Sequence, residues 1–421
     1  MRFTKLSDWL AWQETLHPTE IELGLDRIRE VYDRFGPAKP PYAIITVAGT
    51  NGKGSCVAFL ESILIAAGYK TGAYISPHLV HYNERIRING KEVDDQTLCD
   101  AFARVDEARG DTSITYFEFG TLAALDIYNH AGLDIVILET GMGGRLDAVN
   151  IMDADVALIT SIGIDHTDWL GHDRETISLE KAGIMRSAKP AIYGDLDPTL
   201  SLLKYADEHK VPLSLIARDF HYGWSDDDWS WCDFETKHEH MVKPFMTGDY
   251  QLQNASAALA ALTKLPEKFS INREAIERGL QKASLPGRFQ IVHEQPQWIL
   301  DVAHNPHAAE VLAENLGAHP CTGKTYAVFG MLNDKDVEGV VTRMKDVIDE
   351  WHVCSLKVPR GIEAANLARV AGLEASNRHE SVNDACRSII PMLKKEDRVV
   401  VFGSFYTVSD VMRNVYYNQG T

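Results

Sequence analysis

The sequence of 421 residues lacks several features that define large classes of proteins. Its six cysteines are scattered without a C-x-x-C pair, which argues against a disulfide framework and against zinc ligands. No apolar segment reaches the roughly 18 residues that span a bilayer, and the N-terminus has no basic stretch followed by an apolar run. We therefore expect a cytoplasmic protein with reduced thiols and no membrane partner.

Positive charge is also scarce. The chain has 42 Lys and Arg residues against 60 Asp and Glu residues, a net charge of −18. A nucleic-acid partner requires a basic face, and none is present in the sequence, so we exclude that class. Small anionic substrates remain possible where a few cations gather near the end of a strand.

One stretch, AIITVAGTNGKGSCVAFLESIL at 43–64, combines an apolar β-branched run, a glycine-rich turn and a helical pattern over 56–67. Converging N–H groups and the positive end of a helix dipole suit an anion, and Lys53 adds a full charge. The stretch nevertheless fails the pattern G-x-x-x-x-G-K-[ST], because Val47 replaces the first glycine and Gly54 displaces the hydroxyl residue. We interpret it as a phosphate-binding loop, with an ordinary tight turn as the alternative.

Apolar runs alternate with helical patterns along the chain, which is typical of a parallel sheet covered on both faces. After the apolar run of Ile44, Ile45 and Val47, the predicted strands are 71–76, 134–140, 155–162 and 189–194, followed by 298–303, 325–331, 351–356 and 398–404. The stretch 219–235, with three tryptophans and acidic turns, predicts a small antiparallel excursion. The Pro-Gly within 284–290 separates the two series.

We therefore predict an α/β protein of two domains. The first, 1–286, is a P-loop-type domain with a mostly parallel sheet and the small β excursion. The second, 287–421, is a Rossmann-like α/β domain. A chain of 421 residues is too long for a single core, which agrees with two domains.

Polar residues stand at the carboxyl ends of the predicted strands, where open α/β sheets carry their sites. They are Ser55, Ser76, Glu139 and His166. A carboxylate in the position of Glu139 suits Mg²⁺, although a helix cap or a turn residue is the alternative.

Two histidine-containing stretches have plainer interpretations. The H-x-x-H within 301–309 is interrupted by Pro306, which favours a strand end followed by a helix that begins at this proline. The histidines at 238–240 are expected in a solvated turn.

A series of motifs occurs in the order seen in folylpolyglutamate synthases. They are VAGTNGKGS, YISPHL, TYFEFGTLAAL, ETGMGGRLDAVN, SIGIDHTDWLG, EKAGI, LPGRFQ, DVAHNPHAA and FGSFY. The sequence resembles most the bacterial bifunctional dihydrofolate/folylpolyglutamate synthases of the Mur ligase superfamily, from about Leu23 to the C-terminus. The phosphate loop of that family is commonly G-T-N-G-K-G-[ST], which explains the failed pattern.

The resemblance implies an ATP-dependent ligase that adds L-glutamate to 7,8-dihydropteroate, forming dihydrofolate, and to reduced folates, forming folylpolyglutamates. The carboxylate first accepts the γ-phosphoryl group, and the amine then attacks the acyl phosphate. The family implies ATP as cosubstrate and Mg²⁺, two ions, as cofactor. We expect a monomer whose partners are these small substrates.

The resemblance also assigns roles by position. The ATP-binding set is Thr50, Asn51, Gly52, Lys53, Gly54, Ser55, Asn254, Arg288 and Asp301. The metal set is Ser76, Glu139 and His166, and the catalytic set is Lys53, His166 and Lys181. The substrate-binding set is Thr115, Tyr116, Phe117, Glu118, Leu146, Asp147, Ala148, His304 and Ser404, the last two for glutamate. Carbamylation of Lys181 by CO₂ is expected to help hold the second Mg²⁺, with an unmodified lysine in a salt bridge as the alternative. Tyr406 stands where the family often has a histidine.

Dihydropteroate reacts through an aromatic carboxylate and a reduced folate through a glutamyl γ-carboxylate, yet both must reach the same γ-phosphate of ATP. The pterin ring must therefore be held in a different position for each acid. A second pterin slot is expected from 22–25, 115–118 and 145–148, which are similar to the bifunctional members. Phe117 is expected to stack on the ring, and Thr115 or Asp147 to pair with its polar edge, although Phe117 as a plain core residue is the alternative.

Three other functions are weighed against this one. A folylpolyglutamate synthase alone lacks the second slot. A murein-precursor ligase is expected to carry an additional N-terminal domain, whereas 48 residues precede Gly49 here. A GTPase-type switch needs N-K-x-D, and the nearest string, NDKD at 333–336, has the wrong order.

Overall fold

The computed structural model describes residues 2–19, 21–225, 228–373 and 376–414, and the chain divides into two compact units. The first unit comprises Met1–His78 with Tyr82–Ser284, and the second comprises Leu79–His81 with Leu285–Thr421. No sequence signal indicated that segment 79–81 belongs by its contacts to the second unit. Within the described ranges, no helix is long and apolar enough to cross a bilayer.

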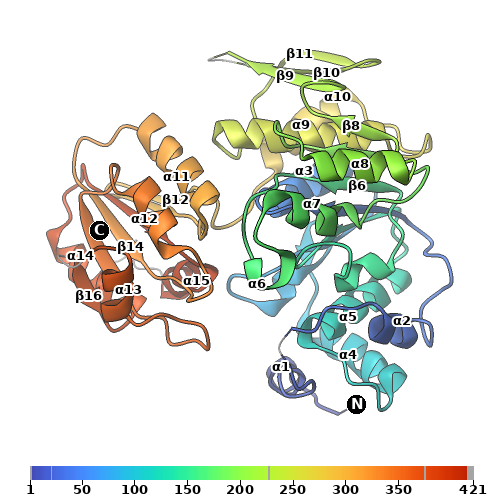
Figure 1. Ribbon diagram of the computed structural model, residues 1–421, viewed down its shortest axis with the longest axis horizontal. Helices are drawn as coiled ribbons and strands as arrows, with labels where there is room; N and C mark the ends of the chain where they lie inside the picture. Colours follow the sequence, from blue (N-terminus) through green and yellow to red (C-terminus); the bar gives the residue numbers. More distant parts are fainter. Residues whose placement is uncertain (1, 20, 226–227, 374–375, 415–421) are drawn as a thin grey trace. The chain divides into compact units, whose positions relative to one another are not determined.

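An eight-stranded sheet forms the centre of the first unit, in the order β4-β3-β2-β5-β1-β6-β7-β8. Two of its strands, β6 and β8, are labelled in Figure 1. The strands are β1 (Ala43–Ala48), β2 (Thr71–Tyr74), β3 (Ile86–Ile88), β4 (Lys91–Glu92), β5 (Ile135–Glu139), β6 (Val156–Ile159), β7 (Ala191–Tyr193) and β8 (Leu213–Leu215). From β2 to β8 the neighbours run parallel, and β3 and β4 extend the sheet in antiparallel fashion. Strands β1, β2, β5, β6 and β7 are buried along their length, as expected for a sheet covered on both faces.

Helices cover both faces of this sheet, as the alternating sequence pattern predicted. One face carries α4 (Asp95–Arg109), α5 (Tyr116–His130), α7 (Arg174–Ala182) and α8 (Leu200–Glu208), and the other carries α3 (Lys53–Ala66), α9 (Asp249–Thr263) and α10 (Arg273–Lys282). The N-terminal α1 (Leu6–Gln13) and α2 (Asp26–Tyr32) pack against α4 and α5, and the short α6 (Thr167–Leu170), η1 (Tyr82–Arg85) and η2 (Ala148–Ile151) lie in connections. Helix α3 begins three residues earlier than 56, which places Lys53 in its first turn.

The predicted antiparallel excursion is a three-stranded sheet of β9 (Phe220–Trp224), β10 (Trp229–Asp233) and β11 (Lys237–Met241). Trp229 and Trp231 are fully buried, and the indole N–H of Trp231 donates to the Ser256 carbonyl of α9 at 3.1 Å. The sheet is therefore fixed on α9. Our expectation of a turn at 238–240 was wrong, because these histidines lie in β11.

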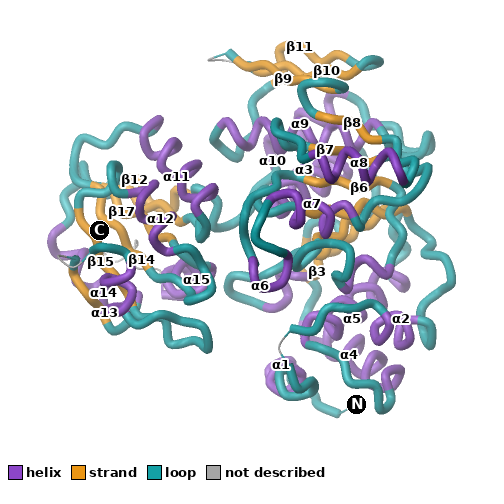
Figure 2. The backbone as a smooth tube through the Cα atoms, in the orientation of Figure 1, coloured by secondary structure: helices purple, strands orange, loops and turns teal. Residues whose placement is uncertain are grey.

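The second unit has a six-stranded sheet in the order β12-β13-β17-β14-β15-β16. Four of its strands, β12, β14, β15 and β17, are labelled in Figure 2. The strands are β12 (Gln290–Glu294), β13 (Gln297–Leu300), β14 (Thr325–Phe329), β15 (Glu350–Cys354), β16 (Asn377–His379) and β17 (Arg398–Phe402). The helices are α11 (Pro306–Ala318), α12 (Val337–Met344), α13 (Ala364–Val370), α14 (Val382–Ile389) and α15 (Phe405–Asn414), with a turn η3 (Ile390–Met392). Only β12 joins antiparallel, and alternate residues of the parallel strands feed two apolar clusters, one on each face. Pro306 occupies the first helical position of α11, as predicted.

Candidate functional site

The loop between β1 and α3 bends sharply and ends in a helix start. Gly52 has φ +86°, a conformation that favours glycine, and a Cβ there would lie 2.5 Å from Oδ1 of Asn254, so a larger residue would displace the Asn254 amide or the loop. Lys53 is the first residue of α3, and its ammonium donates back to the carbonyls of Gly49 at 3.0 Å and Thr50 at 3.2 Å. A lysine charge and the positive end of a helix dipole thus meet at one turn, which is the arrangement of an anion site.

The loop that follows β6 braces this turn. The backbone N–H of Thr50 donates to the Ser161 carbonyl at 2.7 Å, and its hydroxyl donates to the Gly163 carbonyl at 3.0 Å. The hydroxyl of Ser161 donates to the Asn51 carbonyl at 3.1 Å. The same loop continues to His166. It therefore carries a predicted metal ligand and also forms the hydrogen bonds that support the predicted ATP loop.

Helix α9 approaches the phosphate loop from the side of α3. The amide of Asn254 donates to Gln251 at 3.2 Å, and the amide of Gln251 donates to the hydroxyl of Ser55 at 3.3 Å. Gln251 is fully buried, and it thereby connects two residues of the predicted ATP set. The sequence analysis missed Gln251, although its i, i+3 spacing from Asn254 places both on one helix face.

The predicted metal residues follow three strands of the sheet. Ser76, after β2, donates its backbone N–H to Oε2 of Glu139 at 3.3 Å, and Glu139 is the buried last residue of β5. His166 has φ +52°, a left-handed conformation that is uncommon outside glycine and occurs often at functional sites.

The hydroxyl and the carboxylate are oxygen donors that suit a hard cation which also keeps phosphate oxygens, and the imidazole adds one nitrogen donor. Within the described ranges, no group of three or more His, Cys, Asp and Glu side chains is arranged to hold an ion by itself. The predicted set contains two such side chains and one hydroxyl.

Lys181, on α7, is a buried cation close to this edge of the sheet. Burial, chiefly, and the charge of Lys53 together lower the pKa of its ammonium to about 7, against the opposing charges of Asp165 and Asp147. The amine is therefore neutral far more often than an exposed lysine. Asp165 was missed in the sequence, although it directly precedes His166 after a strand, where a carboxylate is itself a signal.

Residues 115–118 form the first turn of α5. Thr115 caps the helix by accepting the Glu118 backbone N–H at 3.2 Å, and the carboxylate of Glu118 accepts the Thr115 N–H at 2.7 Å. Tyr116 and Phe117 are half-buried. The ring of Phe117 lies against Gly141, since a Cβ there would be 2.6 Å from it, and it also packs against the core of the unit.

The segment 145–148 follows β5 and closes a tight loop. Asp147 is buried, and its carboxylate accepts the backbone N–H groups of Met142 at 2.8 Å and Val149 at 3.0 Å. Burial raises its pKa to about 6, against these hydrogen bonds. Asp147 thus shapes the loop from within, while Leu146 is half-buried and Ala148 begins η2.

The other predicted residues lie in the second unit, at the carboxyl ends of β13 and β17. The carboxylate of Asp301 accepts two backbone N–H groups, at 2.7 and 2.8 Å, and burial raises its pKa while the charge of Arg288 opposes the shift. The guanidinium of Arg288 lies 5.3 Å from the ring centre of Phe405, and the ring of His304 lies 6.0 Å from the same centre. The hydroxyl of the buried Ser404 accepts a backbone N–H from the first turn of α15 at 3.0 Å.

The predicted ATP set is therefore divided between the two units. The phosphate loop and Asn254 belong to the first unit, and Arg288 and Asp301 belong to the second.

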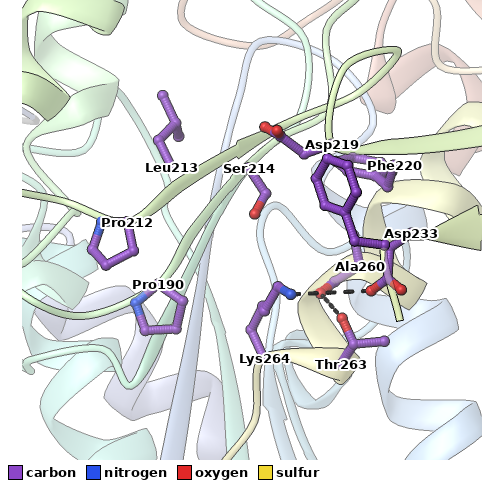
Figure 3. A pocket seen from close by; sticks show the side chains of 11 residues that line it. Pro190, Pro212, Leu213, Ser214, Asp219, Phe220, Asp233, Ala260, Thr263 and Lys264 are labelled. Atoms are coloured by element: carbon purple, nitrogen blue, oxygen red, sulfur yellow. Dashed lines mark hydrogen bonds and ion pairs between the residues drawn. The ribbon is translucent and has the colours of Figure 1, made fainter. Parts of the chain in front are cut away.

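A cavity of about 370 Å³ lies elsewhere in the first unit, between β8, the start of β9, the end of β10 and α9 (Figure 3). Near it, Nζ of Lys264 lies 4.0 Å from the carboxylate of Asp233. Its lining contains no residue of the predicted sets. We assign it no part in the site.

Comparison with known proteins identifies the family. Residues 47–262 match the Mur ligase middle domain, and 287–405 match the Mur ligase, glutamate ligase domain. The chain is 47% identical to dihydrofolate synthase/folylpolyglutamate synthase of Escherichia coli (strain K12) over 97% of this chain and 94% of that protein.

Two solved structures extend the likeness. The structure of E. coli FolC in complex with DHPP and ADP has a TM-score of 0.93 and 46% identity, covering 98% of both chains. A bifunctional folylpolyglutamate synthase/dihydrofolate synthase with Mn, AMPPNP and L-glutamate bound has a TM-score of 0.91 and 46% identity over the same shares. The chain therefore belongs to the Mur ligase family, among the dihydrofolate synthase/folylpolyglutamate synthases.

Proposed function

We propose that this chain is an ATP-dependent ligase that adds L-glutamate to 7,8-dihydropteroate and to reduced folates through an acyl phosphate. The supporting observation is the glycine-rich loop that places Lys53 at the start of α3, next to Asn254. This loop lies in a chain that is similar over nearly its full length to bifunctional enzymes with the same two activities in their names.

The ATP phosphates bind at the turn that carries Lys53, whose ammonium compensates the charge that develops on the transferred phosphoryl group. A carboxylate is a poor electrophile, so transfer of the γ-phosphoryl group to it precedes attack by the amine of glutamate. The amine displaces phosphate and forms the amide. The chief contribution of the protein is the placement of the three reactants and the compensation of their charge.

Ser76, Glu139 and His166 hold Mg²⁺ in this proposal, and the ion neutralises phosphate charge when it is bound. Lys181 would react as a neutral amine with CO₂, its nitrogen forming the bond to carbon and losing one proton to solvent, and the resulting carbamate would help hold a second ion. The burial that lowers the pKa of Lys181 supports this step, because only the unprotonated amine attacks CO₂.

The two predicted domains divide the substrates. Residues 1–286 bind ATP and the pterin acid, and 287–421 supply Arg288 and Asp301 for ATP and His304 and Ser404 for glutamate. The slot for dihydropteroate is built from 22–25, 115–118 and 145–148. The proposal includes a monomer that works in the cytoplasm.

The proposal is tested by following oxygen and ADP together. ADP should form only when a pterin acid and glutamate are both present, and ¹⁸O placed in the carboxylate of the acid should appear in the phosphate. ADP formation without an acid would indicate a simple nucleotide hydrolase. Phosphate free of ¹⁸O would exclude the acyl phosphate.

A further inference from the structure

Arg27, in the first turn of α2, joins two segments that lie far apart in the sequence. Its guanidinium donates to the side chain of Glu22, to the Glu22 backbone carbonyl at 2.9 Å and to Oε1 of Glu118 at 3.1 Å. Among the residues that the structure describes, the hydrogen bonds of Arg27 go to Glu22 and Glu118. Arg27 thus ties the segment 22–25, which precedes α2, to the first turn of α5.

The carboxylate of Glu118 connects Arg27 to the start of α5. Glu118 is 3% exposed, and its second oxygen accepts the backbone N–H of Thr115 at 2.7 Å. A buried carboxylate needs a cationic partner, and the guanidinium of Arg27 supplies it. Without Arg27, the buried carboxylate of Glu118 would lose its cationic partner and move toward water, and the capping hydrogen bond to Thr115 would weaken.

His17 also links the segment 22–25 to the residues just before α5. Nε2 of His17 lies 2.9 Å from Oε2 of Glu22, and Nδ1 lies 2.8 Å from the hydroxyl of Ser113, two residues before the cap of α5. The hydrogen bond from His17 is the largest cause that lowers the pKa of Glu22, with the charge of Arg27 acting in the same direction. Glu22 is therefore held as a carboxylate between two donors.

We propose that Arg27 is a positioning residue that sets the affinity for dihydropteroate, the acid without glutamate, and has little effect on the use of reduced folates. The inference rests on the proposed function, in which 22–25 and 115–118 are two walls of the dihydropteroate slot. Arg27 links these two walls directly, so its loss leaves them joined through His17 alone among the contacts described above and loosens the slot, while the phosphate loop keeps its own hydrogen bonds. The effect should fall on binding of one acid and not on the chemical step.

The test is steady-state kinetics of Arg27→Met with each acid separately, at saturating ATP and glutamate. KM for dihydropteroate should rise at least tenfold while kcat stays within threefold, and KM for tetrahydrofolate should stay within twofold. Arg27→Lys, which keeps the charge, should recover part of the affinity. Arg29→Met is the matched control, because Arg29 is exposed on the same helix.

Glu22→Gln keeps the measurement possible if Arg27→Met folds poorly, because the Glu22 side chain is 49% exposed. It should raise KM for dihydropteroate in the same selective way, by a smaller factor. An equal rise of KM for both acids, or no rise in either variant, would overturn the inference. A parent enzyme that ligates glutamate to tetrahydrofolate but not to dihydropteroate would instead refute the proposed function.

Discussion

Gly52→Ala is the substitution that most sharply tests the geometry of the phosphate loop. Gly52 precedes α3 with φ +86°, and an added Cβ would lie 2.5 Å from Oδ1 of Asn254. A left-handed alanine costs about 1–2 kcal/mol. In addition, an ordinary contact is about 3.4 Å or longer, so the Asn254 amide or the loop must move by about 1 Å.

A displacement of about 1 Å at a reacting centre costs on the order of 100-fold in rate. We therefore expect kcat/KM for ATP to fall about 100-fold for Gly52→Ala, and the free energy of unfolding to fall by about 1–2 kcal/mol. Gly68→Ala is the matched control, because Gly68 follows the other end of α3 with φ +92° and has nothing within 4 Å of its added Cβ.

The assay compares ATP-dependent ligation and urea unfolding for both variants. Gly68→Ala should lose similar stability and keep parental kinetics, because it carries the backbone strain without the displaced amide. If both variants lose activity equally, strain in α3 and not the contact with Asn254 is responsible. If Gly52→Ala keeps parental kcat/KM, the loop does not bind ATP in this conformation.

Three further predictions concern buried or paired charges. Lys53→Ala should reduce the rate of ligation at least 100-fold, which corresponds to about 3 kcal/mol of transition-state stabilisation, and should leave the melting temperature unchanged. Near-parental turnover of this variant would show that the loop takes no part in the mechanism. Ligation should fall when CO₂ is removed and recover with bicarbonate if Lys181 is carbamylated, and a crystal structure should show density beyond Nζ; an activity indifferent to bicarbonate would contradict this. Burial, chiefly, lowers the pKa of His352 and of His379, whose ring nitrogens lie 3.0 Å apart, so both favour the neutral form when folded. The contribution of this pair to the free energy of unfolding should be fully present above pH 6.5 and should decrease below pH 6.5, by up to about 1.4 kcal/mol per pH unit for each histidine. Urea unfolding between pH 7.5 and 5.5 measures this, and a free energy of unfolding that does not change with pH would contradict the assignment.

The fold was predictable where local patterns carry the information. The β-branched runs that became β1, β5, β6 and β17 are bounded by glycine or polar residues and are buried on both faces, so their composition alone indicates parallel strands. The start of α3 was placed too late because glycines at 52 and 54 have low helix propensity, whereas contacts with α9 support the first turn. The strand at 237–241 was missed because most of its residues are exposed and polar.

The candidate site was predictable in its strand-end residues and not in its connections. Glu139 and Lys53 stand next to recognisable strand and helix boundaries, and the resemblance to the family supplied roles for them. The link from Arg27 to Glu118 spans 91 residues and leaves no periodic trace in the sequence. The burial that lowers the pKa of Lys181 likewise arises from packing between segments far apart in the sequence, so no local pattern indicates it.

The most direct test of the central claim is ligation with one acid at a time. The parent enzyme is given radiolabelled glutamate and ATP with dihydropteroate alone, and then with tetrahydrofolate alone. We predict labelled product from both acids, and its loss in both cases with Lys53→Ala, because one phosphate loop serves both reactions. Product from tetrahydrofolate and none from dihydropteroate would contradict the claim and leave a folylpolyglutamate synthase without the second slot.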